Sequence, residues 1–115
     1  MAPDNPSSPR RGEVWWVSFD PSIGGEPRKT RPAVVVSNDA ANRALNRVQI
    51  APITTKVAKI YPGEAYVRVN RARQKAMADQ ITTASKLRLR EQLGKLDPAD
   101  LAAVERAIKI QLGLV

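Results

Sequence analysis

Residues 30–37 read Thr-Arg-Pro-Ala-Val-Val-Val-Ser, so an arginine and a proline stand directly before an apolar run. The three valines are β-branched, and such residues favour strands. The run therefore predicts a fully buried strand over residues 33–37. Pro32 biases the residue before it toward extended geometry, so we expect the guanidinium of Arg31 at a defined place at the mouth of this strand.

A loop and another strand precede this stretch. Residues 14–19 alternate, with Trp15, Val17 and Phe19 on one face, which is strand periodicity. We interpret that face as the core face. Residues 21–31 combine glycine, proline and charge without any period. They predict a loop of about ten residues, long enough for a functional role.

Short elements follow the buried strand. Asn38 or Asp39 could cap a short helix that runs through Leu45. A Pro-Gly turn is expected at residues 62–63 and a short helical turn at residues 86–90. The further strands that apolar patterning predicts cover residues 48–53, 65–69, 78–84 and 92–96.

The C-terminal segment predicts the best helix. Asp97 is a candidate N-cap, Pro98 suits the first helical position, and Gly113 marks the end. Apolar residues form one stripe at helical spacing, namely Leu101, Val104, Ile108 and Leu112. Five or six short strands with a packed terminal helix predict an α+β fold, a small and strongly bent antiparallel β-barrel.

The length and composition fit one folded domain. The chain has 115 residues and an apolar fraction of 43%, which is normal for a globular protein. Residues 1–10 are rich in proline, serine and polar side chains, and we expect a disordered tail there. Residues 11–115 are then the single domain.

Several classes of protein are excluded or disfavoured by what the sequence lacks. There is no cysteine, hence no disulfide or thiolate metal site, and no histidine, the commonest general base and metal ligand. We therefore expect no metal and no cofactor. The apolar runs are too short to span a bilayer, and the N-terminus does not resemble a signal peptide. We expect a cytoplasmic protein without a membrane partner.

The charge balance is strongly basic. Nineteen lysines and arginines face 11 acidic residues, a net charge of +8. This is compatible with an ordinary basic surface, but it also suits a polyanionic partner, most simply nucleic acid. Charge alone does not distinguish DNA, RNA and an acidic protein.

Several fragments in a fixed order carry a family resemblance. They are Arg-Gly-Glu-Val-Trp-Trp at 11–16, Asp-Pro and Gly-Gly-Glu within 20–26, Thr-Arg-Pro at 30–32, Ala-Pro-Ile-Thr-Thr at 51–55 and Ala-Asp-Gln-Ile at 78–81. Over about residues 11–114 the chain resembles the MazF/PemK family of toxin ribonucleases. The resemblance implies an SH3-like barrel that forms a homodimer and cleaves single-stranded RNA at specific sequences and without a metal. It also implies a cognate MazE-like antitoxin whose acidic C-terminal segment fills the same groove.

The resemblance and the chemistry of phosphate binding point to Arg31 and Thr54. A guanidinium forks onto two phosphate oxygens, and the family carries a catalytic arginine at this Arg-Pro step. The alternative is an ion pair of Arg31 with a carboxylate at the strand start. The hydroxyl of Thr54 can donate to a phosphate oxygen, although Thr55 is only one residue away.

Asp79 is the third candidate catalytic residue. Its carboxylate could accept the proton of the RNA 2′-hydroxyl, a role assigned to an acidic residue in some relatives. The alternative is a structural aspartate that pairs with Arg31 or with a backbone amide. Met77 stands where some relatives carry a basic residue, so a mechanism using a second arginine there does not transfer.

Six further residues are expected to bind RNA. The resemblance implies that the loop before Arg31 gates both RNA and antitoxin, although it could also be an ordinary surface loop. The six residues flank the three catalytic candidates: Gly25, Glu26, Lys29, Thr55, Lys56 and Gln80. Trp16 could stack on a base or fill the dimer seam, and we favour the seam.

Two other functions remain open. The same barrel occurs in toxins of the CcdB type that poison DNA gyrase, and a basic barrel could bind RNA without cutting it. The combination of Arg31, Thr54 and Asp79 favours cleavage, because a gyrase poison does not need it.

Overall fold

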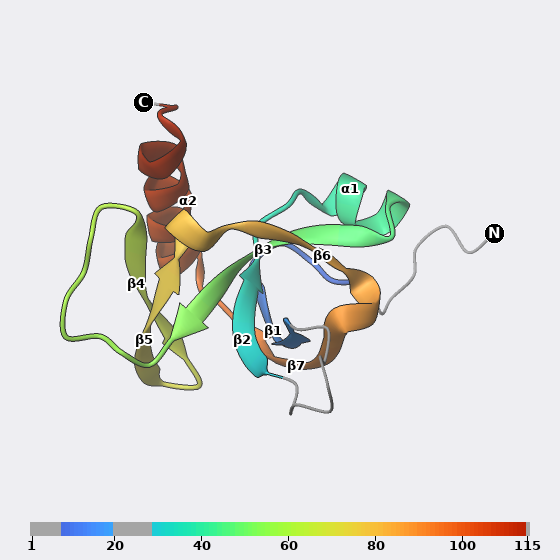
Figure 1. Cartoon of the computed structure of the whole chain (residues 1–115), viewed down its shortest axis with the longest axis horizontal. Helices are drawn as coiled ribbons and strands as arrows, with labels where there is room; N and C mark the ends of the chain where they lie inside the picture. Colours follow the sequence, from blue (N-terminus) through green and yellow to red (C-terminus); the bar gives the residue numbers. More distant parts are fainter. Residues whose placement is uncertain (1–7, 20–28, 115) are drawn as a thin grey trace.

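The structure, a computed structural model, describes residues 8–19 and 29–114, which form a curled antiparallel sheet with a long helix at one end (Figure 1). The strands are β1 Glu13–Ser18, β2 Thr30–Val35, β3 Arg47–Thr54, β4 Glu64–Val69, β5 Ala72–Met77, β6 Thr82–Ser85 and β7 Leu89–Lys95. The helices are α1 Asp39–Ala44 and α2 Pro98–Leu112, with 3-10 turns η1 Ala78–Gln80 and η2 Lys86–Arg88. The predicted α+β fold is confirmed, with the sheet curled into a half-closed barrel.

β3 is the strand on which the sheet turns. Its first half pairs with β6, its middle pairs with β2, and its last two residues pair with β5. The order through the sheet is β4-β5-β3-β2-β1-β7. A strand that passes from one set of partners to another must bend, so the C-terminal end of β3 lies where the two parts of the sheet diverge (Figure 1).

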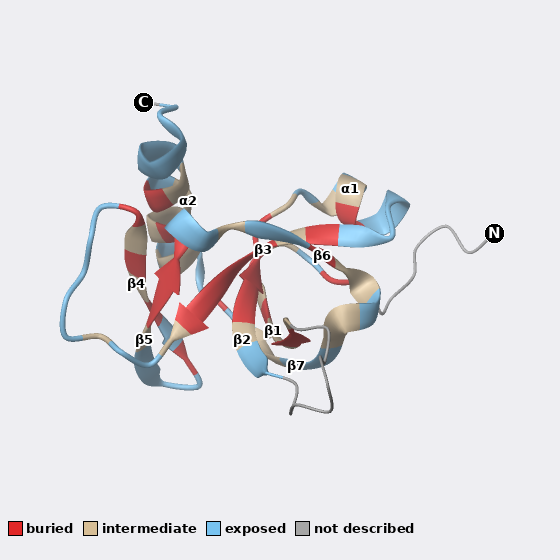
Figure 2. Cartoon of the chain, viewed as in Figure 1, coloured by how far each residue is buried: buried red, intermediate tan, exposed pale blue. Residues whose placement is uncertain are grey.

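The core has two parts, on either side of this bend (Figure 2). One cluster lies between β4, β5 and α2 and includes Val67 and Val104; the other lies inside the curl and includes Val17 and Ile50. Trp15 and Phe19 pack against the second cluster, as predicted. The other face of this strand also contributes to the core, because Val14 points the other way and is fully buried in the first cluster.

The hairpin of β4 and β5 differs from the prediction. β4 matches the expected strand, but β5 was not predicted because its sequence, Ala-Arg-Gln-Lys-Ala-Met, shows no apolar alternation. Its residues pair with β4 on one side and with the end of β3 on the other. Asn70 and Arg71 form the turn, with positive φ of 50° and 69°. Backbone hydrogen bonds to both neighbouring strands form β5, although most of its side chains are not apolar.

The segment after β5 also needs a correction. A strand over 78–84 was predicted, whereas the chain makes the turn η1 first and becomes a strand, β6, only at Thr82. Ile81 N donates to Ala78 O and closes the turn. The short helical turn predicted at 86–90 is confirmed as η2, and β7 begins earlier than the predicted strand.

The helix caps agree with the sequence. Asn38, not Asp39, caps α1 by accepting from Ala41 N, and Asp97 caps α2 by accepting from Asp100 N. The predicted stripe of α2 is only partly buried, because Leu112 is 53% exposed past the end of the sheet. No helix within residues 8–19 and 29–114 is long and apolar enough to cross a membrane.

Only residues 8–10 of the predicted N-terminal tail, residues 1–10, lie within the described part of the chain. Ser8 and Pro9 are buried, although the prediction put the tail through residue 10. Residues 1–7 lie outside the described part of the chain. Gly12 N donates to Val35 O, which fixes the start of β1 against the end of β2.

Candidate functional site

The sheet brings Arg31 and Thr54 to one place. β2 and β3 are antiparallel, with Ala33 opposite Pro52 and Val34 opposite Ala51. Continuing this register puts Arg31 opposite Thr54, where β3 leaves β2 to pair with β5. Both side chains therefore reach the region where the sheet opens, and the proline after Arg31 keeps its backbone extended.

An open groove lies at this point, with a volume of about 690 Å³. Five of the lining residues are candidates or neighbours of candidates from the sequence: Arg31, Thr54, Thr55, Lys56 and Gln80. The walls also include Trp16, Pro32, Ile53, Val69, Asn70, Ala72, Gln74, Met77 and Leu93. The lining of the groove thus combines cationic side chains, two hydroxyls and several apolar side chains.

The guanidinium of Arg31 is available to a ligand. The residue is exposed, and within the part of the chain that the structure describes its side chain has no hydrogen-bond or ion-pair partner. The alternative of an ion pair with a carboxylate is therefore not found among these residues. A positioned, unpaired guanidinium is well suited to a phosphate.

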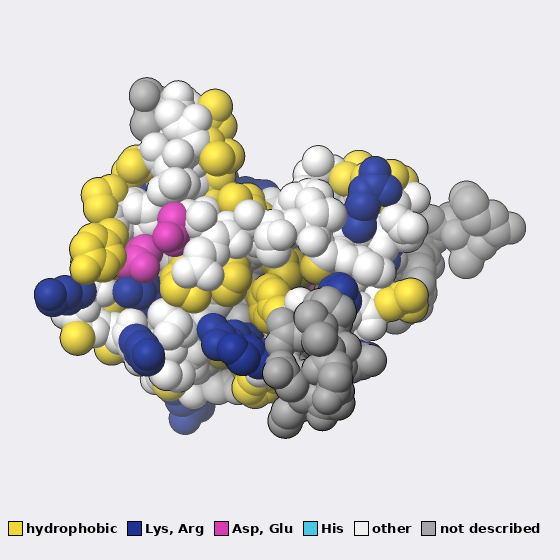
Figure 3. Space-filling view, viewed as in Figure 1, with side chains coloured by type: hydrophobic (Ala, Val, Ile, Leu, Met, Phe, Trp, Pro, Cys, Tyr) yellow, Lys and Arg dark blue, Asp and Glu magenta, His cyan; other side chains and the backbone are white. Residues whose placement is uncertain are grey.

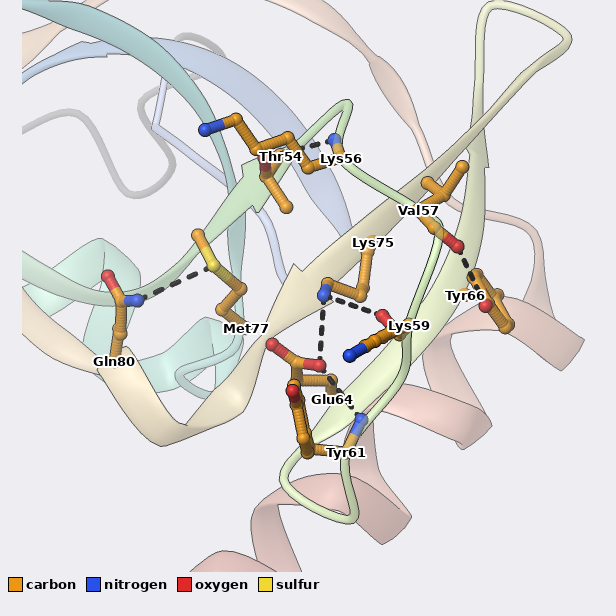
Figure 4. A network of polar contacts seen from close by, with 10 residues as sticks. All are labelled: Thr54, Lys56, Val57, Lys59, Tyr61, Glu64, Tyr66, Lys75, Met77 and Gln80. Carbon is orange, nitrogen blue, oxygen red and sulfur yellow. Dashed lines mark hydrogen bonds and ion pairs between the residues drawn. The ribbon is translucent and has the colours of Figure 1, made fainter.

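Thr54 is oriented by the chain that follows it. Its Oγ accepts a hydrogen bond from Lys56 N at 3.2 Å (Figure 4). Because the oxygen is an acceptor in this bond, its own proton remains free to be donated. Thr54 is half-buried, whereas Thr55 and Lys56 are exposed. The geometry favours Thr54 over Thr55 as the fixed hydroxyl.

A second, smaller hollow adjoins the groove. It has a volume of about 200 Å³ and is lined by Phe19, Lys29, Arg31, Pro52 and Gln80. Arg31 and Gln80 belong to both hollows, so the two form a continuous path across the ends of β2 and η1. Lys29 is thereby brought into the site. The predicted Gly25 and Glu26 lie outside the described residues.

Asp79 is not brought into this groove. It lines another hollow with Tyr61, Pro62, Gly63, Glu64, Ile110 and Gln111. The turn η1 causes the separation, because Asp79 N donates to Gly63 O and draws the residue toward the start of β4. In a single chain, Asp79 therefore lines a different hollow from Arg31 and Thr54, with which the sequence groups it.

Three groove residues were missed or given another role in the sequence. Trp16 lines the groove, although the dimer seam was favoured for it. Asn70 and Gln74 also line it, and Gln74 Oε1 is buried without a hydrogen-bond partner among the described residues. Trp16 could have been found from its place on the face of β1 opposite Trp15, Val17 and Phe19. Asn70 and Gln74 belong to the β4–β5 hairpin, whose second strand the sequence does not predict.

The charged surface is uneven. On the face shown in Figure 3, lysine and arginine side chains are spread over the surface, with several in the lower half and one prominent at the upper right, while the acidic ones gather at one place. The described lining of the groove includes no carboxylate. Across residues 8–19 and 29–114, no group of three or more Asp, Glu, His or Cys is placed to hold a metal ion.

Comparison with known proteins decides the family. The profile of the family described as PemK-like, MazF-like toxin of type II toxin-antitoxin system matches residues 10–112. The chain belongs to this toxin family. Its relatives include endoribonuclease MazF9 of Mycobacterium tuberculosis, 38% identical over 91% of this chain and 97% of the relative. Endoribonuclease MazF of Staphylococcus saprophyticus is 34% identical over 91% and 92% of the two chains.

Solved structures of the family share the fold. A MazE–MazF complex from Deinococcus radiodurans superposes with a TM-score of 0.79 at 27% identity, covering 94% of this chain and 98% of the other. An endoribonuclease in complex with its cognate antitoxin, from a mycobacterial species, gives a TM-score of 0.77 at 28% identity, covering 93% and 97%. The toxin fold is thus common to almost the whole chain.

Proposed function

We propose that this toxin cleaves single-stranded RNA in the groove of Arg31 and Thr54, without a metal, through attack by the RNA's own 2′-hydroxyl. The chain is an endoribonuclease of a type II toxin–antitoxin family, and the proposal concerns where and how it cuts. The observation that carries it is one groove that holds two donors: the Arg31 guanidinium, which has no side-chain partner among residues 8–19 and 29–114, and the Thr54 hydroxyl, which accepts from Lys56 N and keeps its own proton to donate.

Cleavage proceeds by transfer of the phosphoryl group within the RNA. The 2′-oxygen attacks the adjacent phosphorus and loses its proton, the bond from phosphorus to the 5′-oxygen breaks, and that oxygen takes up a proton. The products are a 2′,3′-cyclic phosphate and a 5′-hydroxyl. Negative charge builds up on the non-bridging oxygens during attack, and donors already in place stabilise it most effectively. Arg31 and Thr54 are those donors.

The other lining residues hold the strand. Lys56 lines the groove and Lys29 the smaller hollow, both of which Arg31 also lines, and each lysine can neutralise a backbone phosphate. Trp16 in the groove and Phe19 in the smaller hollow offer two aromatic surfaces for unstacked bases. Thr55 and Gln80 add polar groups beside them. Such a path suits a single strand, because a paired base would not reach the aromatic rings.

The proposed partners follow from the same groove. We expect a homodimer acting in the cytoplasm, and a cognate MazE-like antitoxin whose acidic segment occupies the basic path in place of RNA. Titration of the toxin with antitoxin should therefore displace a bound, uncleavable RNA. A ternary complex with both ligands on every site would contradict a shared groove.

One cleavage assay tests the mechanism and its alternatives. Purified toxin is incubated with end-labelled single-stranded RNA in EDTA, and the ends of the fragments are identified. We expect full activity and fragments that end in a 2′,3′-cyclic phosphate and a 5′-hydroxyl. In a separate supercoiling assay we expect no inhibition of gyrase. One deoxynucleotide just 5′ of the scissile phosphate should block cleavage but not binding. Efficient cutting of that substrate would show that water is the nucleophile.

A further inference from the structure

A buried ion pair lies behind the groove, on the hairpin of β4 and β5. Lys75 Nζ lies 3.0 Å from Glu64 Oε1, and both side chains are only 9% exposed (Figure 4). Lys75 also donates to the backbone oxygen of Lys59 at 2.9 Å. Burial of two opposite charges carries a desolvation cost that an apolar pair would not. We therefore ask which backbone groups the two side chains hold in place.

These bonds hold the connection between β3 and β4, residues 55–63, which has no helix or strand of its own. Its backbone makes hydrogen bonds with side chains of the hairpin at Val57, Lys59 and Tyr61, and we call these three hydrogen bonds ties. Tyr66 Oη donates to Val57 O at 2.9 Å, Lys75 donates to Lys59 O, and Glu64 accepts from Tyr61 N at 2.9 Å. Figure 4 shows the three ties in a row.

The connection directly follows Thr54, the last residue of β3, so its position bears on the groove. Thr54 and Lys75 are direct partners across β3 and β5. The hydroxyl of Thr54 is fixed by Lys56 N, the second residue of the connection. Movement of the connection would release that bond and allow the hydroxyl to turn away from the phosphate.

We propose that Lys75 is a positioning residue for RNA cleavage: with Glu64 and Tyr66, it holds the 55–63 connection so that Lys56 N orients Thr54. This inference rests on the proposed function, because it gives Thr54 a part in cleavage. Lys75 itself does not line the groove, so its effect is indirect. A misplaced catalytic group slows the chemical step more than it weakens binding.

The test measures cleavage and the state of the connection separately. Lys75→Met, Lys75→Arg and Tyr66→Phe are compared with wild type in single-turnover cleavage over a range of RNA concentrations. Limited trypsin digestion with mass spectrometry follows cutting after Lys56 and Lys59 in the absence of RNA. Arg68→Met is the matched control: it removes the same charge from an exposed position on β4 and makes no tie to the connection through its side chain.

We expect Lys75→Met to lower kcat roughly ten- to a hundredfold, with KM changed less than about threefold, and to be cut faster after Lys59. Lys75→Arg keeps the cation and its donors and should recover most of the activity. Tyr66→Phe removes one tie without exposing a buried charge and should show both effects to a smaller extent. Arg68→Met should stay within about twofold of wild type.

Two results would overturn the inference. One is faster trypsin cutting of the connection with unchanged kcat, and the other is a lower kcat with unchanged trypsin protection. If Lys75→Met does not fold, the same two readouts on Tyr66→Phe decide. Arg31→Ala is assayed in parallel: full activity there contradicts the proposed function, whereas full activity in Lys75→Met alone contradicts only the positioning role.

Discussion

Asp79 and Gln80 are neighbours in the chain but line different hollows. Gln80 lies beside Arg31 in the groove and in the smaller hollow, whereas Asp79 faces Gly63 and the end of α2. The 3-10 turn η1 produces this divergence, since successive residues of such a turn point in different directions. The acidic residue that the sequence offered as a base is thus directed away from the proposed site.

Asp79→Asn tests whether its carboxylate takes part in cleavage. From its place beside Gly63 we predict a cleavage rate within about threefold of wild type, because general-base catalysis contributes roughly a hundredfold or more when present. Single-turnover rates across the pH range measure this directly. A loss of two orders of magnitude with an unchanged thermal melt would place the carboxylate in the reaction after all.

Trp16 should report on RNA binding. Trp16 lines the groove, whereas Trp15 packs against the core. Stacking of a base should therefore quench the fluorescence of Trp16 and not that of Trp15. We predict a drop in tryptophan fluorescence when a deoxy-substituted, uncleavable RNA is added, and loss of most of that signal in Trp16→Phe. An equal drop in the variant would show that the RNA does not contact this wall of the groove.

The salt dependence of RNA affinity should scale with the number of lysine and arginine side chains that contact phosphates in the two hollows. Lys29, Arg31 and Lys56 line the two hollows, and three contacts to single-stranded phosphates predict a slope of log affinity against log salt of about −2. Lys56→Ala should make the slope shallower by about 0.7. Binding of an uncleavable RNA measured between low and moderate salt provides the test, and an unchanged slope would remove Lys56 from the path.

Two glycines allow a matched test of the fold. Gly12 and Gly113 both have positive φ, 90° and 70°, but a Cβ on Gly12 would lie 3.3 Å from Leu101 Cδ2, whereas one on Gly113 would meet nothing within 4 Å. We predict that Gly113→Ala costs about 1 kcal/mol of unfolding free energy and Gly12→Ala about 2–3 kcal/mol. Urea unfolding compares them; equal costs would show that the contact with α2 is unimportant.

The sequence predicts the elements of this fold better than it predicts the site. Apolar patterns and caps locate β1, β2, β3, β4 and both helices, because burial and capping leave local signals. β5 has none: Lys75 is buried only because Glu64 and the connection surround it, and such a partner cannot be read from a pattern. Asp79 shows the same limit, since one turn decides which hollow a residue faces.

The single-turnover cleavage rate of Arg31→Ala at saturating RNA is the sharpest test of whether RNA is cleaved in this groove. Arg106→Ala, an exposed arginine on α2, is the control for loss of charge. We predict a fall of at least roughly a hundredfold in Arg31→Ala, a fall of about tenfold to a thousandfold in Thr54→Val, and unchanged thermal melts. A wild-type rate in a folded Arg31→Ala protein would contradict the assignment of this groove.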